Sequence, residues 1–158
     1  MKILETERLI LRSFVEGDFE AVHAYASVAE NVIYMVWGPN DESDTIEFIL
    51  QAIKHSKEVP CPNYQFAVIE KESRKLIGAC NIVMVRESEG EIGWILHRDC
   101  WKQGFGTEMG KRLLQFGFQQ LGLHRLIAYC DTENYGSFRV MEKIGMRREG
   151  PFSRKSTC

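Results

Sequence analysis

The fold is decided by Trp101-Lys102-Gln103-Gly104-Phe105-Gly106-Thr107, which joins a predicted strand to a long predicted helix. Gly104 and Gly106 can adopt backbone conformations closed to other residues and let a ligand approach the main chain. The first N–H groups of the following helix have no partner within it, and they point back at the loop with the positive end of the helix dipole. The sequence therefore predicts an anion site here. The alternative is that the two glycines only ease a tight strand-to-helix turn.

The glycine spacing argues against two common nucleotide loops. A dinucleotide fingerprint has a third glycine three residues after Gly106, where this chain has Met109. A Walker A loop ends in Gly-Lys followed by Ser or Thr, and this pattern is absent from the sequence.

Other elements are predicted on both sides of this loop. Before it we expect, in chain order, a strand at 8–14, a helix capped by Asp18, a helix at 43–57, and strands at 64–69, 75–85 and 91–97. After it we expect a helix at 104–120 that ends at Gly122, a strand at 124–130, a helix at 135–144 and a short strand at 146–149. This order indicates an α/β fold on a mixed sheet, and 158 residues suit a single domain over 1–158.

Composition excludes several functional classes. The net charge of −2 gives no large positive field, so we expect no nucleic-acid partner. No apolar run approaches the ~20 residues of a membrane span, and charges come too early for a signal peptide, so we expect a cytoplasmic protein with no membrane partner. The five cysteines include no C-x-x-C pair, so we expect reduced thiols and no metal site.

Several spaced motifs, agreeing in order, resemble the GNAT acetyltransferase superfamily and, within it, the RimJ/RimL-type branch. They are Glu5-Thr6-Glu7-Arg8-Leu9-Ile10-Leu11-Arg12, Gly90-Glu91-Ile92-Gly93-Trp94-Ile95-Leu96-His97, the loop above with Glu108, Gly122-Leu123-His124-Arg125, Cys130-Asp131-Thr132-Glu133-Asn134, and the stretch from Ser137 to Gly150. The match spans nearly the whole chain and is weakest between about residues 30 and 62. It implies a GNAT-like mixed, mostly antiparallel sheet, flanked by helices on both faces, with a splayed strand pair for acetyl-CoA.

The resemblance implies that acetyl-CoA is a co-substrate and that it is held along this loop. Its pyrophosphate would meet backbone amides of Lys102, Gln103, Gly104, Phe105, Gly106 and Thr107, with positive charge from Lys102, Lys111 or Arg139. Its pantetheine arm would lie along the exposed backbone of Ile95, Leu96 and His97, because a strand edge offers free N–H and C=O groups. An N–H there can polarise the thioester carbonyl. Asn134 would bind the arm, or cap the next helix.

The resemblance also suggests catalytic residues. Met141 stands where many members have a proton-donating tyrosine, so Ser137 is the predicted proton donor or thiolate partner, and Tyr135 is a further candidate. Glu91 is the predicted general base, with His97 second. An α-amine, with a pKa of about 7.7–8.0, is partly neutral at pH 7, whereas lysine at about 10.4 is not. Weak evidence for a base therefore favours α-amines slightly.

The end of the chain departs from the branch. Residues 151–158 do not have a strand pattern, so the last strand is expected to be missing or altered, which would leave an edge open to a second copy as a homodimer, or impair the enzyme. The leading prediction is an acetyl-CoA-dependent N-acetyltransferase acting on a primary amine, either a protein N-terminus or a small molecule. The alternatives are a catalytically weak acyl-CoA-binding module and a nucleotide-binding domain.

Overall fold

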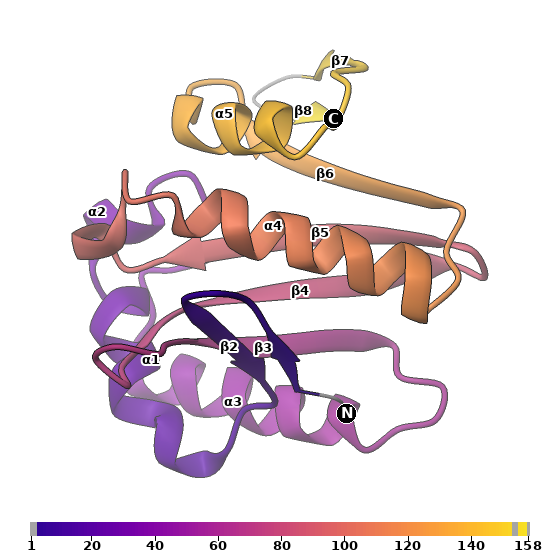
Figure 1. Ribbon diagram of the computed structural model, residues 1–158. Helices are drawn as coiled ribbons and strands as arrows, with labels where there is room; N and C mark the ends of the chain where they lie inside the picture. Colours follow the sequence, from indigo (N-terminus) through magenta and orange to yellow (C-terminus); the bar gives the residue numbers. More distant parts are fainter. Residues whose placement is uncertain (1–2, 153–154, 158) are drawn as a thin grey trace.

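The computed structural model describes residues 3–152 and 155–157. In this part of the chain eight strands form one sheet in the order β1-β2-β3-β4-β5-β6-β8-β7 (Figure 1). They are β1 (Leu4–Glu5), β2 (Leu9–Arg12), β3 (Asn63–Glu70), β4 (Leu76–Arg86), β5 (Glu89–Leu96), β6 (Arg125–Asp131), β7 (Gly150–Phe152) and β8 (Lys155–Thr157). The β5–β6 pair is parallel and the other pairs are antiparallel, so the predicted mixed, mostly antiparallel sheet is confirmed.

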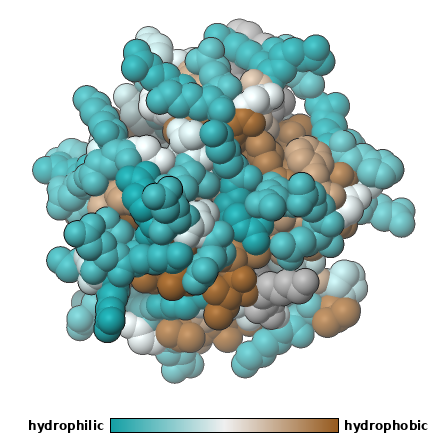
Figure 2. All heavy atoms as spheres, viewed as in Figure 1, coloured by the Kyte–Doolittle hydropathy of each residue, from teal (hydrophilic) through white to brown (hydrophobic). Residues whose placement is uncertain are grey.

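Helices cover both faces of this sheet, as predicted. One face carries α1 (Phe19–Ala26), α2 (Ala29–Val32) and α3 (Glu42–Ser56), and the other carries α4 (Phe105–Gln115) and α5 (Tyr135–Lys143). Short 3-10 turns at 16–18 and 98–100 and a π-helical turn at 116–120 complete the helical elements that the structure describes. Figure 1 shows α4 and α5 lying on the same side of β4, β5 and β6. Figure 2 shows that hydrophilic side chains cover most of this side of the molecule.

The sequence of α4 explains how it packs. Phe105, Met109 and Leu113 recur every four residues, and all three are buried against the sheet. Gly122, with φ +68°, follows the end of the π-helical turn in the left-handed conformation that favours glycine. The predicted helix and its predicted end therefore agree with the structure.

The parallel strands β5 and β6 separate along their length. They pair from Glu89 with Arg125 to Ile92 with Ala128, and beyond this point neither strand is paired with the other. Over Tyr129–Asp131, β6 pairs instead with β8 on its other side. The result is the predicted splayed pair, whose gap opens toward the carboxyl ends of both strands.

Three local predictions were wrong. Residues 146–149 form no strand, and the next strand, β7, starts at Gly150. The tail does form a strand, β8, which covers the edge of β6 over three residue pairs, although a segment this short has no alternating pattern to reveal it. The Asp18 side chain does not cap α1, because its carboxylate accepts two hydrogen bonds from Arg12, both 2.9 Å, and one from the Val15 N–H.

No helix of the described residues is long and apolar enough to cross a membrane.

Candidate active site

A cleft of about 1040 Å³ lies at the splayed ends of β5 and β6. It is lined by the end of β5, the loop before α4, the first turns of α4 and α5, and the segment around α2. Residues from both faces of the sheet contribute to this lining, so the cleft passes through the gap between the strands. Its volume is at the upper end of the roughly 300–1,000 Å³ typical of small-molecule sites, as a long cofactor would require.

The two glycines of the loop have different structural roles. Gly104 has φ +83° at the start of α4, a conformation that strains other residues, and Lys102 has φ +62°. Gly106 allows α4 to approach α5 closely, because a Cβ added there would lie 3.0 Å from Val140 Cγ2. The first turn of α4 lines the cleft, so its unpaired N–H groups are available to an anion there. The tight turn therefore explains Gly104, helix packing explains Gly106, and the anion site stays a prediction.

The N-terminal segment holds this loop from outside. The Arg8 guanidinium donates to the Gln103 carbonyl at 2.9 Å and to the Glu108 carboxylate at 2.7 Å, and it stacks over the Phe105 ring. Glu108 also accepts hydrogen bonds from the Thr6 hydroxyl and the Arg8 N–H. Burial acts to raise the pKa of Glu108, but the hydrogen bonds from Thr6 and Arg8 outweigh it and hold that pKa below its ordinary value. The carboxylate is therefore kept ionised where it fixes the start of α4.

Three cations line the cleft on the α4 and α5 side. They are Lys102, Arg139 and Lys143, all exposed, whereas Lys111 is not part of the lining. Lys143 was not among the predicted residues, although it lies four residues after Arg139 and therefore on the same face of α5. Together with the N-terminus of α4, these side chains form a suitable environment for phosphate groups.

The end of β5 differs in part from the prediction. The His97 N–H donates to the Ile77 carbonyl at 2.7 Å, so it is already paired with β4. In an antiparallel pair these groups alternate in direction, so the backbone of Ile95 also faces β4. Of the three predicted residues, Leu96 therefore turns its backbone toward the gap, together with Trp94, which was not predicted.

The Leu96 carbonyl has two donors from within the protein. Trp101 Nε1 donates to it at 3.0 Å and Asn31 Nδ2 donates at 2.9 Å, while Asn31 Oδ1 accepts from the Arg98 N–H. Asn31 is buried, and these bonds tie α2 to the end of β5. What remains for a ligand at this edge is the Leu96 N–H and the backbone of Trp94.

The predicted residues of the β6–α5 connection do come together. Asn134 and Ser137 both line the cleft, and Asn134 Oδ1 caps α5 by accepting from the Ser137 N–H at 3.2 Å. The Ser137 hydroxyl has no hydrogen bond to another described residue and is available to a ligand. Met141 is buried in the core. The N-terminus of α5 thus faces the same cleft as that of α4.

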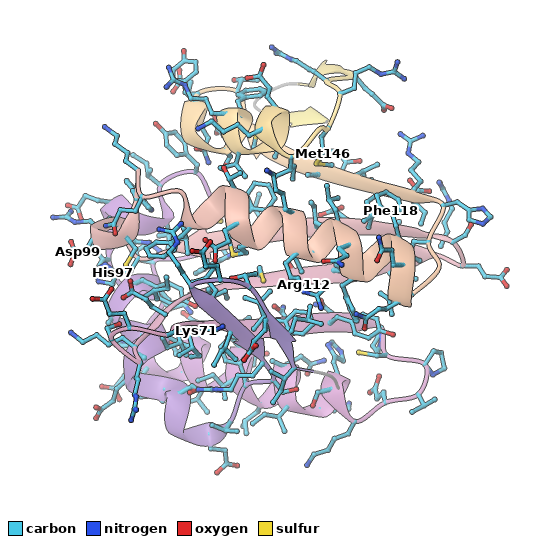
Figure 3. All side chains as sticks on the ribbon, viewed as in Figure 1. Lys71, His97, Asp99, Arg112, Phe118 and Met146 are labelled. Atoms are coloured by element: carbon cyan, nitrogen blue, oxygen red, sulfur yellow. The ribbon has the colours of Figure 1, made fainter. Side chains whose placement is uncertain are left out.

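The two predicted bases lie outside the cleft lining. Glu91, half-buried on β5, faces the same side of the sheet as Ile95. His97 Nδ1 accepts from the Asp99 N–H and lies 3.6 Å from the Asp99 carboxylate, and Figure 3 shows the two side chains together at the margin of the molecule.

Cys100 does line the cleft, and burial raises the pKa of its thiol. No cluster of His, Cys, Asp and Glu suited to a metal occurs in the described residues.

Comparisons with known proteins agree with this architecture. The model of the acetyltransferase (GNAT) domain matches residues 8–147. The uncharacterized N-acetyltransferase YnaD of Bacillus subtilis (strain 168) is 36% identical over 154 residues, which cover 96% of this chain and 86% of that protein. A GNAT-family acetyltransferase structure from Bacillus anthracis has a TM-score of 0.85 and 34% identity, covering 99% of this chain and 96% of that chain.

A more distant structure shares the fold. The spermidine N-acetyltransferase of Vibrio cholerae, solved in complex with CoA and spermine, has a TM-score of 0.79 and 20% identity, covering 96% of this chain and 93% of that chain. The domain match and the relatives both extend along nearly the whole chain. The splayed strands β5 and β6 lie within the matched region. The chain therefore belongs to the GNAT acetyltransferase family and is an acetyltransferase enzyme.

Proposed function

We propose that this enzyme uses acetyl-CoA and transfers its acetyl group directly to a primary amine. The observation that carries the proposal is the cleft, which begins at the N-terminus of α4 and crosses the sheet between β5 and β6. Such a passage lets a long anionic cofactor enter from one face while an amine reaches its thioester from the other. Both halves of this passage would belong to the single domain that we propose for residues 1–158.

The cofactor-binding residues follow from this arrangement. Its pyrophosphate would meet the loop from Lys102 to Thr107, with Arg139 and Lys143 adding positive charge from α5. The arm would lie against the open backbone of Trp94 and Leu96 as a missing strand does. The side-chain nitrogen of Asn134 remains available for an arm carbonyl, because the cap of α5 uses Oδ1.

Ser137 is the proposed proton donor in the chemical step. The amine nitrogen forms a bond to the thioester carbonyl carbon, the C–S bond breaks, the nitrogen loses a proton and the departing sulfur takes one up. The Ser137 hydroxyl lies in the first turn of α5, where the helix dipole also favours a developing thiolate. An N–H at the open edge of β5 would stabilise negative charge on the carbonyl oxygen.

The proton on the amine poses a separate question. Neither Glu91 nor His97 lines the cleft, so each remains a prediction, with Glu91 acting through water. An enzyme whose predicted bases lie outside its cleft works best on amines that are already partly neutral. Peptide and amino-acid α-amines, with a pKa of about 7.7–8.0, meet this requirement near pH 7.

Two finer expectations belong to the same proposal. Assignment to the RimJ/RimL-type branch is supported by the N-terminal motif. Its residues Thr6 and Arg8 bind Glu108 in the first turn of α4, next to the loop. A cytoplasmic location is supported by the cysteines of the described residues, since Cys61, Cys80, Cys100 and Cys130 form no disulfide. A homodimer stays a prediction.

Calorimetry with acetyl-CoA tests the proposal. We expect micromolar binding that is lost in Gly106→Trp, where the new side chain would be directed against Val140 of α5 beside the loop. Because Gly106 also packs against Val140, the double variant Lys102→Ala/Arg139→Ala provides a second test without a clash. Gly17→Ala is the matched control, since no atom lies within 4 Å of an added Cβ there.

Turnover separates the enzyme from its alternative. Release of free CoA that depends on an added amine supports acetyl transfer. Tight binding of acetyl-CoA with no transfer to any amine would instead identify an acyl-CoA-binding module. A folded chain that does not bind acetyl-CoA would contradict the proposal altogether.

A further inference from the structure

The walls of the cleft are chemically divided between its two sides. On the α4 and α5 side the lining includes Lys102, Arg139 and Lys143. On the α2 side it consists largely of apolar and aromatic side chains, namely those of Ile33, Tyr34 and Met35. The basic side suits the phosphates of the cofactor, so under the proposed function the apolar side is the one that meets the acceptor.

Polar atoms on the α2 side are already paired within the protein. Asn31 uses its amide nitrogen on the Leu96 carbonyl and its amide oxygen on the Arg98 N–H. Trp101 Nε1 donates to the same carbonyl. Among the described lining residues on this side, the Tyr34 hydroxyl is the side-chain polar group without such a partner. The surface offered to an acceptor is therefore apolar, with one hydroxyl.

Negative charge is also scarce on this side. The nearby carboxylates of Glu30 and Asp99 do not line the cleft, and each has a partner, since Glu30 lies 3.8 Å from Arg98 and Asp99 lies 3.6 Å from a ring nitrogen of His97. Glu133 is the sole carboxylate among the lining residues that the structure describes, and it belongs to the β6–α5 connection. A second ammonium group on the acceptor would thus lose water without gaining a counter-charge, which is unfavourable.

The apolar side chains of this wall are open to solvent. Ile33 is 67% exposed and Tyr34 is 37% exposed, although both are large and hydrophobic in character. An exposed apolar surface at the mouth of a cleft is typical of a ligand-binding wall. Val36, in the same segment, is 76% exposed but does not line the cleft. It therefore provides a control for substitutions at Ile33 and Tyr34.

We propose that the acceptor is a primary monoamine with an apolar or aromatic group next to the amine, held against Ile33, Tyr34 and Met35. This inference rests on the proposed function and adds the class of acceptor to it. The amine would reach the thioester at the gap between the strands, while the apolar group displaces water from the wall. Polyamines and amines without a side chain would be poor acceptors.

Three amino-acid amides and a polyamine test the acceptor class. Phenylalaninamide, leucinamide and glycinamide share an α-amine and differ in side chain, and spermidine adds further cations. With acetyl-CoA saturating, kcat/KM is measured from free CoA release. We expect the phenylalanine and leucine amides to exceed glycinamide by at least about tenfold, the scale on which a hydrophobic pocket discriminates. Spermidine should fall below both.

Variants locate the preference on this wall. Ile33→Ser and Tyr34→Ala should each reduce the ratio of phenylalaninamide to glycinamide several-fold, with the acetyl-CoA Kd unchanged. Val36→Ser, a change at a more exposed position of the same segment, should leave the ratio as it is. A ratio that is unaltered in both wall variants, or altered equally by Val36→Ser, would overturn the proposal.

The remaining outcomes distinguish this inference from the function beneath it. If spermidine is the better acceptor and Glu133→Gln abolishes that activity, the inference fails and the site is a polyamine site. If acetyl-CoA binds but neither apolar amide is acetylated, the inference fails and the cofactor assignment stands. If acetyl-CoA does not bind, the proposed function itself fails.

Discussion

Arg8 and Glu108, 100 positions apart in the chain, form an ion pair at 2.7 Å that joins the N-terminal segment to the first turn of α4. The same guanidinium holds the Gln103 carbonyl, so the pair fixes both sides of Gly104. The loop is therefore positioned by residues that do not line the cleft themselves. The residues that position the loop thus differ from those that are expected to bind the anion. The two roles can be tested by separate substitutions.

Arg8→Ala should weaken acetyl-CoA binding by about tenfold, because the loop loses its donor to Gln103 and its anchor on Glu108. Calorimetry measures the change. Lys71→Ala is the control, since the Lys71 side chain, labelled in Figure 3, makes a surface pair with Glu5 at 3.7 Å that does not involve a loop residue. Equal affinities for the two variants would show that Arg8 does not position the loop.

Stability should depend on pH through Glu108. Its pKa is lowered in the folded protein, so its ionised form stabilises the fold above the unfolded-chain pKa of about 4.3. This contribution is lost as the pH falls through the lower, folded pKa. Urea unfolding should therefore show the wild-type advantage over Glu108→Gln shrinking in acid. Glu47→Gln, an exposed change on α3, should show no such trend.

Gly104→Ala should lower the free energy of unfolding by about 1–2 kcal/mol, the cost of a left-handed conformation for a residue with a Cβ. Chemical denaturation measures this change. Gly17→Ala should have little effect, because its φ is not positive and its surroundings are open. Similar losses in the two variants would contradict the role given to the backbone at Gly104.

Ser137→Ala should reduce kcat by roughly 10²-fold, the lower end of what a positioned proton donor provides. The KM for acetyl-CoA should change little, and Ser137→Thr, which keeps a hydroxyl, should recover part of the rate. A larger loss in Tyr135→Phe than in Ser137→Ala would move the donor role to Tyr135, which also lines the cleft.

Acetyl-CoA should protect Cys100 from alkylation. Its thiol lines the cleft, and its raised pKa makes it react slowly at neutral pH, so labelling should accelerate as the pH increases. Mass spectrometry of the labelled peptides gives the rate for each cysteine. Cys61, which lies outside the cleft lining, should label at the same rate with and without acetyl-CoA. Protection of both thiols, or of neither, would contradict the proposed position of the cofactor.

Features that repeat along the chain could be predicted from the sequence, and features made by distant residues could not. The spacing of Phe105, Met109 and Leu113 predicted α4, whereas the anion site at the loop before it stays a prediction. Asn31 gave no such signal, because its partners, the Leu96 carbonyl and the Arg98 N–H, lie 65 and 67 positions away. The pairing of β8 with β6 is likewise a tertiary contact of a short segment.

The prediction of which backbone groups face the cleft was only partly correct, for a related reason. Placing Ile95, Leu96 and His97 at one open edge treated neighbouring residues alike, whereas consecutive residues of a strand turn their N–H and C=O groups to opposite sides. The His97 bond to Ile77 fixes which residues face the gap. That choice depends on the register of β5 against β4, which no local pattern in β5 specifies.

The two hydrogen bonds on the Leu96 carbonyl also bear on how the free enzyme stays in solution. A gap wide enough for a cofactor arm leaves strand edges exposed, and exposed edges invite pairing with strands of other molecules, the first step of aggregation. Trp101 and Asn31 occupy the last acceptor of β5, so an incoming strand finds an interrupted ladder. The hydrogen bonds that shape the site thus also disfavour self-association of the ligand-free enzyme.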